Sequence, residues 1–287
     1  MQHKVWGIMN KFVVMEEGIT PFDTNHLWQD TGTALLYQVD NNLYKMFIKD
    51  PDEKKVILEE LLNKEELKHL PGYPQAGIAT TSGKYGFSME YIKDSCTLYQ
   101  FKNREYTLQE LVSLFIDISN TVKYINSFGI HFSDLNDNNV LITDNMKPII
   151  IDYDDAVVFP YSSRHVSGSI WNFYNMKDKS KQFNKHFIKH GNFDMIALFL
   201  LFLDYALKIN IRNYEDKRIN DLSALIKLYM SNEFYNAFQE IVSARMWNNC
   251  QQIKPFTYYL HDCLESGIAI KQLEEMNREY INAYNRI

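Results

Sequence analysis

The sequence predicts an α+β fold with two lobes: a small β-rich lobe that contains one helix, and a larger, mainly helical lobe. Three observations predict it. Runs of β-prone residues between turn clusters gather before about residue 92, whereas apolar residues at helical spacing dominate after it. No Pro/Gly/Ser-rich linker divides the 287 residues. We therefore expect an N-terminal lobe at residues 1–91, a C-terminal lobe at residues 92–287, and a ligand site between them.

In the first third, residues 34–39 and 43–48 are β-prone and flank Asp40-Asn41-Asn42, a turn-forming cluster. This pattern predicts a hairpin. Residues 53–70 carry leucine and isoleucine on one helical face and predict a helix, which opens at Pro51-Asp52 and ends at Pro71-Gly72.

Farther along the chain, residues 85–92 predict a further strand. Thr107 and Glu110 then form a capping box, so a helix is expected from there to near Gly129. A polar, aromatic segment follows at about residues 161–189, and several helices are expected after it.

Composition excludes several classes of protein. Hydrophobic residues make up 46% of the chain and charged residues 23%, which is typical of a globular protein and not of a disordered one. The formal net charge of −6 argues against a dedicated nucleic-acid binder, so we expect no nucleic-acid partner.

The sequence also bears on location. Three unclustered cysteines fit a reducing compartment, and the N-terminus does not have the pattern of a signal peptide. The longest apolar run, Met195 to Leu203, is too short to span a bilayer and predicts a buried helix. We expect a cytoplasmic protein with no membrane span; delivery into a host cell remains an open alternative.

Two acidic clusters are the candidates for a site. They are "HFSDLNDNNVLI" at residues 131–142 and "IIIDYDDA" at residues 149–156. Taken alone, an Asp/Asn-rich loop is typical of a solvated turn. However, the β-prone runs "NVLIT" and "KPIII" should form a short hairpin that brings Asp152 back beside Asn139.

This pairing has a chemical meaning. A carboxylate beside an amide oxygen is suited to Mg²⁺, which is bound through few protein groups together with phosphates. Asp134, one loop away, would then accept a proton from a hydroxyl nucleophile. Such a set suits phosphoryl transfer. Asp137 and Asn138 of the same loop are expected to serve only in the turn.

These motifs resemble those of the eukaryotic-type Ser/Thr protein-kinase superfamily. "FSDLNDNNVLI" resembles the kinase catalytic loop, and "IIIDYDDA" resembles the segment that carries D-F-G. The resemblance implies that Asp134 is the catalytic base and that Asn139 and Asp152 bind Mg²⁺. It also implies that Lys45, in "NLYKMF", grips the phosphates of ATP.

The resemblance assigns further roles. "SMEYI" resembles the hinge between lobes, in which Glu90, Tyr91 and Ile92 present backbone to adenine. Asp194 corresponds to an aspartate that caps the large buried helix and braces the catalytic loop. A helix glutamate should pair with the strand lysine. Glu60 fits best, and Glu53 and Glu59 are the alternatives.

The sequence also departs from the family. Ser133 replaces the arginine that reads an activation-loop phosphate, and Asn136 replaces a lysine that steadies the transferred group. Asp154 stands in place of the D-F-G glycine, and the phosphate-covering loop has only Gly32 where the family has three glycines.

We therefore expect an ATP- and Mg²⁺-dependent protein kinase that acts on Ser/Thr of an unknown protein substrate. A pseudokinase that serves as a binding module and a small-molecule kinase are the alternatives.

Overall fold

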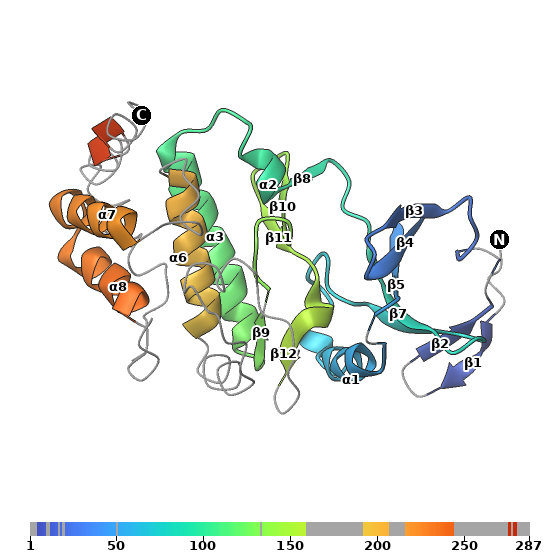
Figure 1. Ribbon diagram of the computed structural model, residues 1–287. Helices are drawn as coiled ribbons and strands as arrows, with labels where there is room; N and C mark the ends of the chain where they lie inside the picture. Colours follow the sequence, from blue (N-terminus) through green and yellow to red (C-terminus); the bar gives the residue numbers. More distant parts are fainter. Residues whose placement is uncertain are drawn as a thin grey trace.

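The computed structural model confirms the α+β class (Figure 1). It describes residues 5–9, 12–16, 18, 21–49, 51–132, 134–158, 192–206, 216–243, 275–276 and 278–279. The expected segment at 161–189 and residue Ser133 lie outside these ranges. None of the described helices combines the length and the apolar character needed to cross a membrane.

A mixed seven-stranded sheet forms the N-terminal part, in the order β1-β2-β6-β7-β5-β4-β3. Neighbouring strands are antiparallel except β2 and β6, which are parallel. The strands are β1 (Val5–Met9), β2 (Phe12–Met15), β3 (Leu27–Asp30), β4 (Ala34–Val39), β5 (Asn42–Phe47), β6 (Ala76–Thr80) and β7 (Tyr85–Glu90).

The predicted hairpin is β4–β5, with Val39 paired to Asn42. Its turn is one residue shorter than expected, and Asp40 takes the left-handed conformation (φ 52°). Asp tolerates this conformation better than most residues do.

Helix α1 (Pro51–Leu61) is shorter than predicted. The expected helix to residue 70 is wrong, because the chain turns after Leu61 and continues as the short 3-10 helix η1 (Glu65–Leu67). The Leu61 carbonyl accepts from the Lys64 N–H (2.9 Å) and from the Tyr73 hydroxyl (2.7 Å), so it is bonded without a further helical turn. The turn also lets Leu67 enter the core.

The remainder of the chain is mainly helical, with short strands. It comprises β8 (Ser95–Thr97), α2 (Leu98–Phe101), α3 (Leu108–Asn126), β9 (Ile130–Phe132), β10 (Val140–Thr143), β11 (Pro148–Ile150), η2 (Tyr153–Asp155), β12 (Ala156–Val158), α6 (Asn192–Ala206), α7 (Asp216–Tyr229) and α8 (Asn232–Ser243). The predicted capping box of α3 is present: Thr107 Oγ1 accepts from the Glu110 N–H, and Glu110 Oε2 accepts from the Thr107 N–H.

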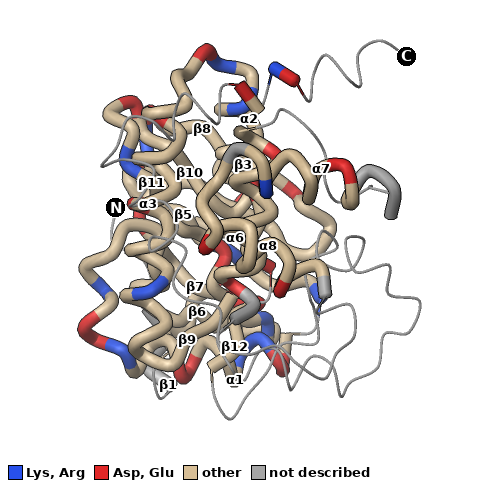
Figure 2. The backbone as a smooth tube through the Cα atoms, turned by 90° about the vertical axis from the view of Figure 1, so that its left-hand side faces the viewer, with Lys and Arg blue, Asp and Glu red and all other residues tan. Residues whose placement is uncertain are grey.

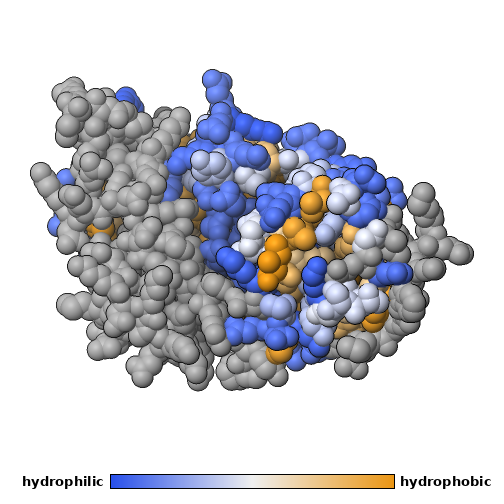
Figure 3. Space-filling model, turned by 45° about the vertical axis from the view of Figure 1, so that its right-hand side comes forward, coloured by the Kyte–Doolittle hydropathy of each residue, from blue (hydrophilic) through white to orange (hydrophobic). Residues whose placement is uncertain are grey.

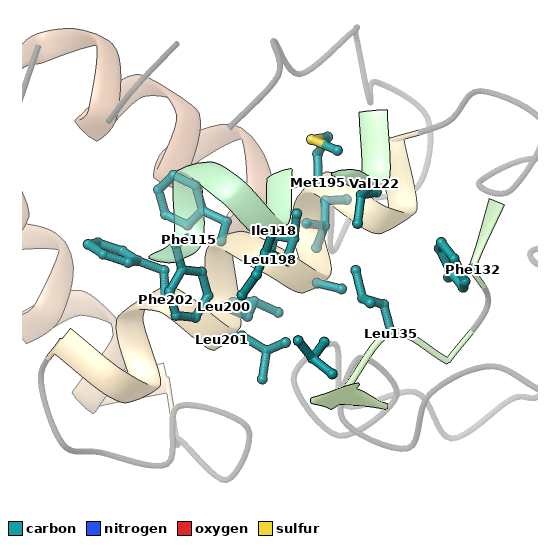
Figure 4. Close-up of a cluster of buried hydrophobic side chains, with 14 of the residues drawn as sticks. Phe115, Ile118, Val122, Phe132, Leu135, Met195, Leu198, Leu200, Leu201 and Phe202 are labelled. Atoms are coloured by element: carbon teal, nitrogen blue, oxygen red, sulfur yellow. The ribbon is translucent and has the colours of Figure 1, made fainter. Parts of the chain in front are cut away.

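The main core lies between α3 and α6 (Figure 4). From Asp194 to its end, α6 is buried on every side, as its apolar run predicts. Phe132 and Leu135, on either side of Asp134, belong to the same core, so packing holds the chain before and after Asp134.

Helix α1 joins this core to the sheet (Figure 1). Ile57 and Leu61 of α1 pack into the main core, whereas Leu58 packs with the side chains of the sheet, among them Phe47 and Phe87. Helix α1 is therefore one of the elements that hold the sheet against the helical part.

The closeness of packing at the junction of these two parts can be tested at Gly72, which lies against Ile150 and Ile151. It has φ +78°, and an added Cβ would lie 2.8 Å from the Ile150 carbonyl oxygen and 2.9 Å from Ile151 Cγ2. Gly72→Ala should therefore lower the free energy of unfolding by more than the about 1–2 kcal/mol of left-handed strain alone. Urea unfolding measures the loss.

Gly83→Ala is the matched control, because Gly83 has φ +88° and no heavy atom lies within 4 Å of the position that its added Cβ would take. Equal losses for the two variants would show that the contact between Gly72 and β11 is not tight.

Candidate functional site

The hairpin β10–β11 places Asn139 and Asp152 at the same end of two paired strands. Val140 pairs with Ile150, and the Ile151 N–H donates to the Asn139 carbonyl (2.9 Å). The predicted hairpin is confirmed. Because Asn139 immediately precedes one strand and Asp152 closely follows the other, the two candidate metal ligands adjoin the same backbone contact.

The loop from Asp134 to Asn139 is held by its own amide side chains. Asn139 Nδ2 donates to the Asp134 carbonyl (2.9 Å), and Asn136 Nδ2 donates to the same oxygen (3.2 Å). Asn136 Oδ1 accepts from the Asn138 N–H (2.8 Å). Since Nδ2 of Asn139 is committed to the loop, its Oδ1 is the atom suited to a cation.

Asp137 has a larger role than expected. The prediction that it serves only in the turn is wrong: Asp137 is buried, and its carbonyl accepts from the Tyr99 N–H (2.8 Å). The hydroxyl of Tyr205 on α6 lies 3.4 Å from its carboxylate. Asp137 thus ties the loop to α2 and α6.

Asp194 braces the other end of the loop, as predicted. Its Oδ2 accepts from the Phe132 N–H (3.2 Å) and from Asn126 Nδ2 (2.6 Å), and His131 Nδ1 lies 3.8 Å away. Complete burial raises the pKa of Asp194, and the nearby His131 opposes this shift.

Lys45 enters the site from β5. Its ammonium forms an ion pair with Asp152 and a second one with Asp154 (Nζ–Oδ1, 2.6 Å). Burial opposes the charge of Lys45, but the two carboxylates outweigh it and raise the pKa of the ammonium above its ordinary value. The predicted strand lysine therefore meets the predicted metal-binding aspartate.

Helix α1 contributes a lysine to this site where a glutamate was expected. Lys54 Nζ lies 2.6 Å from Asp154 Oδ2 and 3.2 Å from Asp155 Oδ2. The expected pairing of Lys45 with Glu60 is wrong: among the described residues, the carboxylates that contact Lys45 are those of Asp152 and Asp154. Glu53 and Glu59, the two alternatives, are likewise not among the carboxylates that contact Lys45.

The helix geometry explains the difference. The buried face of α1 consists of Lys54, Ile57, Leu58 and Leu61. At 3.6 residues per turn, Glu59 and Glu60 lie about 120–140° around the helix from Lys54, and Glu53 about 100° from it. Turning a glutamate toward Lys45 would expose the apolar residues of this face.

The two neighbouring aspartates differ in charge. Burial and the adjacent Asp154 raise the pKa of Asp152 to about 7, although Lys45 opposes the shift. Burial also disfavours the charge of Asp154, but Lys45 and Lys54 outweigh it and lower the pKa of that carboxyl. Asp154 is therefore the firmly ionised member of the pair.

The backbone at Asp152 explains how both aspartates reach one lysine. Asp152 is left-handed (φ 70°) and precedes the 3-10 turn η2. Tyr153, between the two aspartates, is buried with its ring 4.9 Å from that of Tyr73 and 5.2 Å from that of Phe132. A strained backbone held by packing is typical of functional sites.

The predicted hinge residues lie at the end of β7 and directly after it. The Tyr91 N–H donates to the Asn41 carbonyl (2.8 Å), and the Ile92 carbonyl accepts from Ser95 Oγ (2.9 Å). Glu90 is the last residue of β7 and is exposed. Tyr91 is thus bonded to the β4–β5 turn and Ile92 to the first residue of β8.

Trp28 of β3 packs edge-on against Tyr91, with 6.1 Å between ring centroids, and is 51% exposed. Hydrophilic residues dominate the described part of the face in Figure 3 and surround a small hydrophobic group.

Gly32, the one glycine of the predicted phosphate-covering loop, lies in the turn between β3 and β4 with φ 74°. Its N–H donates to Asp30 Oδ1 (2.7 Å).

The donor set offers Mg²⁺ two hard oxygen ligands, the Asp152 carboxylate and Asn139 Oδ1. Within the described ranges, no group of three or more His, Cys, Asp or Glu residues is arranged to bind a metal ion. Mg²⁺ instead takes one or two carboxylates together with phosphates. Three carboxyl groups face two ammonium groups in this cluster, so it carries one excess negative charge when Asp152 is ionised.

Comparison with known proteins does not identify a family. No protein-family model matches the sequence, and no curated protein matches it. The assignment of a function therefore depends on the motifs and on the geometry of the site.

Asp194 tests the bracing of the loop. Asp194→Asn should lower the free energy of unfolding by about 1–3 kcal/mol. Its one side-chain oxygen can still accept from Phe132 and Asn126 but without the charge, and its buried NH2 group takes the place of Oδ1, which has no hydrogen-bond partner among the described residues. Asp117→Asn, on the exposed side of α3, should change it by less than about 0.5 kcal/mol. Equal stability of the two variants in urea unfolding would contradict the bracing role.

Proposed function

We propose that this protein is an ATP- and Mg²⁺-dependent phosphotransferase of the protein-kinase type that acts on Ser/Thr hydroxyls of a protein substrate. The observation that carries the proposal is the contact of Lys45 with Asp152, which are 107 residues apart in the chain. It unites the two motifs whose chemistry would be phosphate binding and metal binding.

The order of the elements supports the same proposal. A strand that carries Lys45, helix α1 and strand β7 precede the segment 90–92, and the loop and hairpin follow after α3. The arrangement as two kinase-like lobes, residues 1–91 and 92–287, belongs to the proposal, and so does a hinge at Glu90, Tyr91 and Ile92. Figure 2 shows Lys/Arg and Asp/Glu positions interspersed along the described chain.

In this mechanism Lys45 binds phosphate oxygens of ATP, and Asn139 Oδ1 and the Asp152 carboxylate would hold Mg²⁺. The ion supplies positive charge that offsets the negative charge of the phosphates. Asp134 accepts the proton of the acceptor hydroxyl as its oxygen bonds to the γ-phosphorus. The bond from that phosphorus to the bridging oxygen breaks, and ADP leaves. An ATP-dependent enzyme with unclustered cysteines fits a cytoplasmic location.

A nucleotide-binding pseudokinase is the second candidate. One observation favours it: Lys45 is engaged by two carboxylates, which nucleotide phosphates would have to displace or share. This candidate predicts binding without transfer.

The test is transfer of labelled γ-phosphate from ATP in the presence of Mg²⁺ and whole lysate. Asp134→Ala and Asp152→Ala should each lower the rate at least about 100-fold, because each removes a group that acts in the transfer step. Asp144→Ala, in the exposed turn of the same hairpin, should keep the rate.

Full activity of Asp152→Ala would overturn the mechanism. An increase in melting temperature with Mg-ATP but no transfer by the wild type would favour the pseudokinase. Labelling of metabolites alone would move the acceptor to a small molecule.

A further inference from the structure

Asp154 lies between two ammonium groups. Its Oδ1 is 2.6 Å from Lys45 Nζ, its Oδ2 is 2.6 Å from Lys54 Nζ, and its side chain is completely buried. The two oxygens of one carboxylate are thus divided between a strand lysine and a helix lysine. This bridge joins β5, η2 and α1.

Asp152 cannot fill the same place during binding of a metal–nucleotide complex. Its carboxylate is the proposed ligand of Mg²⁺, and the cation would draw that group away from Lys45. Lys45 would then need another anion to hold its ammonium toward the phosphates. Asp154 remains available, because it is one residue from Tyr153, which is anchored in the core.

Lys54 explains why a second carboxylate can be buried here. An isolated buried carboxylate is unfavourable, and one ammonium shared with Asp152 would compensate it poorly. Lys54 supplies the missing charge, and its own ammonium is held by Asp155 and lies 5.4 Å from the Phe47 ring centroid. The side chain is 7% exposed, so it contacts the site and not the solvent.

We propose that Asp154 is a positioning residue that holds Lys45 for a Mg²⁺–nucleoside triphosphate, and that Lys54 is the counter-ion that keeps Asp154 in place. The inference rests on the proposed function. It assigns to an aspartate of η2 the task that the sequence led us to expect from a glutamate of α1.

A merely structural ion bridge predicts something different. A buried ion pair that is replaced as a whole by neutral residues of similar volume often keeps its stability. The double variant Asp154→Asn/Lys54→Met should therefore fold in either case. A structural role predicts wild-type affinity for nucleotide, whereas a positioning role predicts that affinity falls.

The experiment measures binding of the non-hydrolysable analogue AMP-PNP with Mg²⁺ by isothermal titration calorimetry. Circular dichroism and thermal melting establish that each variant is folded. Asp154→Asn/Lys54→Met should bind about tenfold more weakly or worse, because Lys45 loses a charge-assisted contact.

Lys55→Met is the matched control. Lys55 is the neighbouring lysine on α1, and its ammonium lies over the Tyr85 ring (4.3 Å to the centroid), away from the bridge. This variant should bind as the wild type does.

Wild-type affinity in Asp154→Asn/Lys54→Met would overturn the inference and leave the transfer assay to decide the proposed function. Wild-type binding without transfer, together with the expected order of variants, would support the positioning role and refute the transferase. No binding by the wild type would overturn both.

Discussion

The ion network of Lys45, Lys54, Asp152, Asp154 and Asp155 is the interaction on which the site depends. Removing charged groups from water is costly unless they are paired, and these five groups come from a strand, a helix and the turn after a hairpin. Their pairing therefore requires that the sheet, α1 and the end of the β10–β11 hairpin meet in one arrangement. The apolar packing of α1 on both sides reinforces that arrangement.

Asp152 and Asp154 differ in burial and in charge within this network. Asp152 is partly exposed and its charge is disfavoured by its surroundings, so a cation would stabilise it. Asp154 is fully buried and firmly ionised between two lysines. On binding of a metal–nucleotide complex, Asp152 would exchange Lys45 for the metal ion. The ion pairs of Asp154 with Lys45 and Lys54 would stay in place, so no buried charge would lose its partner.

The sequence predicts the local features well because they depend on neighbouring residues. The hairpins β4–β5 and β10–β11, the capping box of α3 and the buried α6 follow from turn residues and periodicity. The partner of Lys45 does not, since Asp154 is 109 residues away. One signal could have revealed Lys54: it shares a helical face with Ile57, Leu58 and Leu61, and a charge on an apolar face needs a buried partner. The end of α1 was hidden because its apolar spacing continues past Leu61.

The most direct test of a magnesium–nucleotide site is the affinity of the wild-type protein for ATP, measured by calorimetry with Mg²⁺ and again with EDTA. The geometry of Lys45, Asn139 and Asp152 predicts binding with Mg²⁺ and at least about tenfold weaker binding without it, because the carboxylate then faces the phosphates with no cation between them. Equal affinity in the two conditions, or no binding in either, would contradict the assignment of this cluster as a magnesium–nucleotide site.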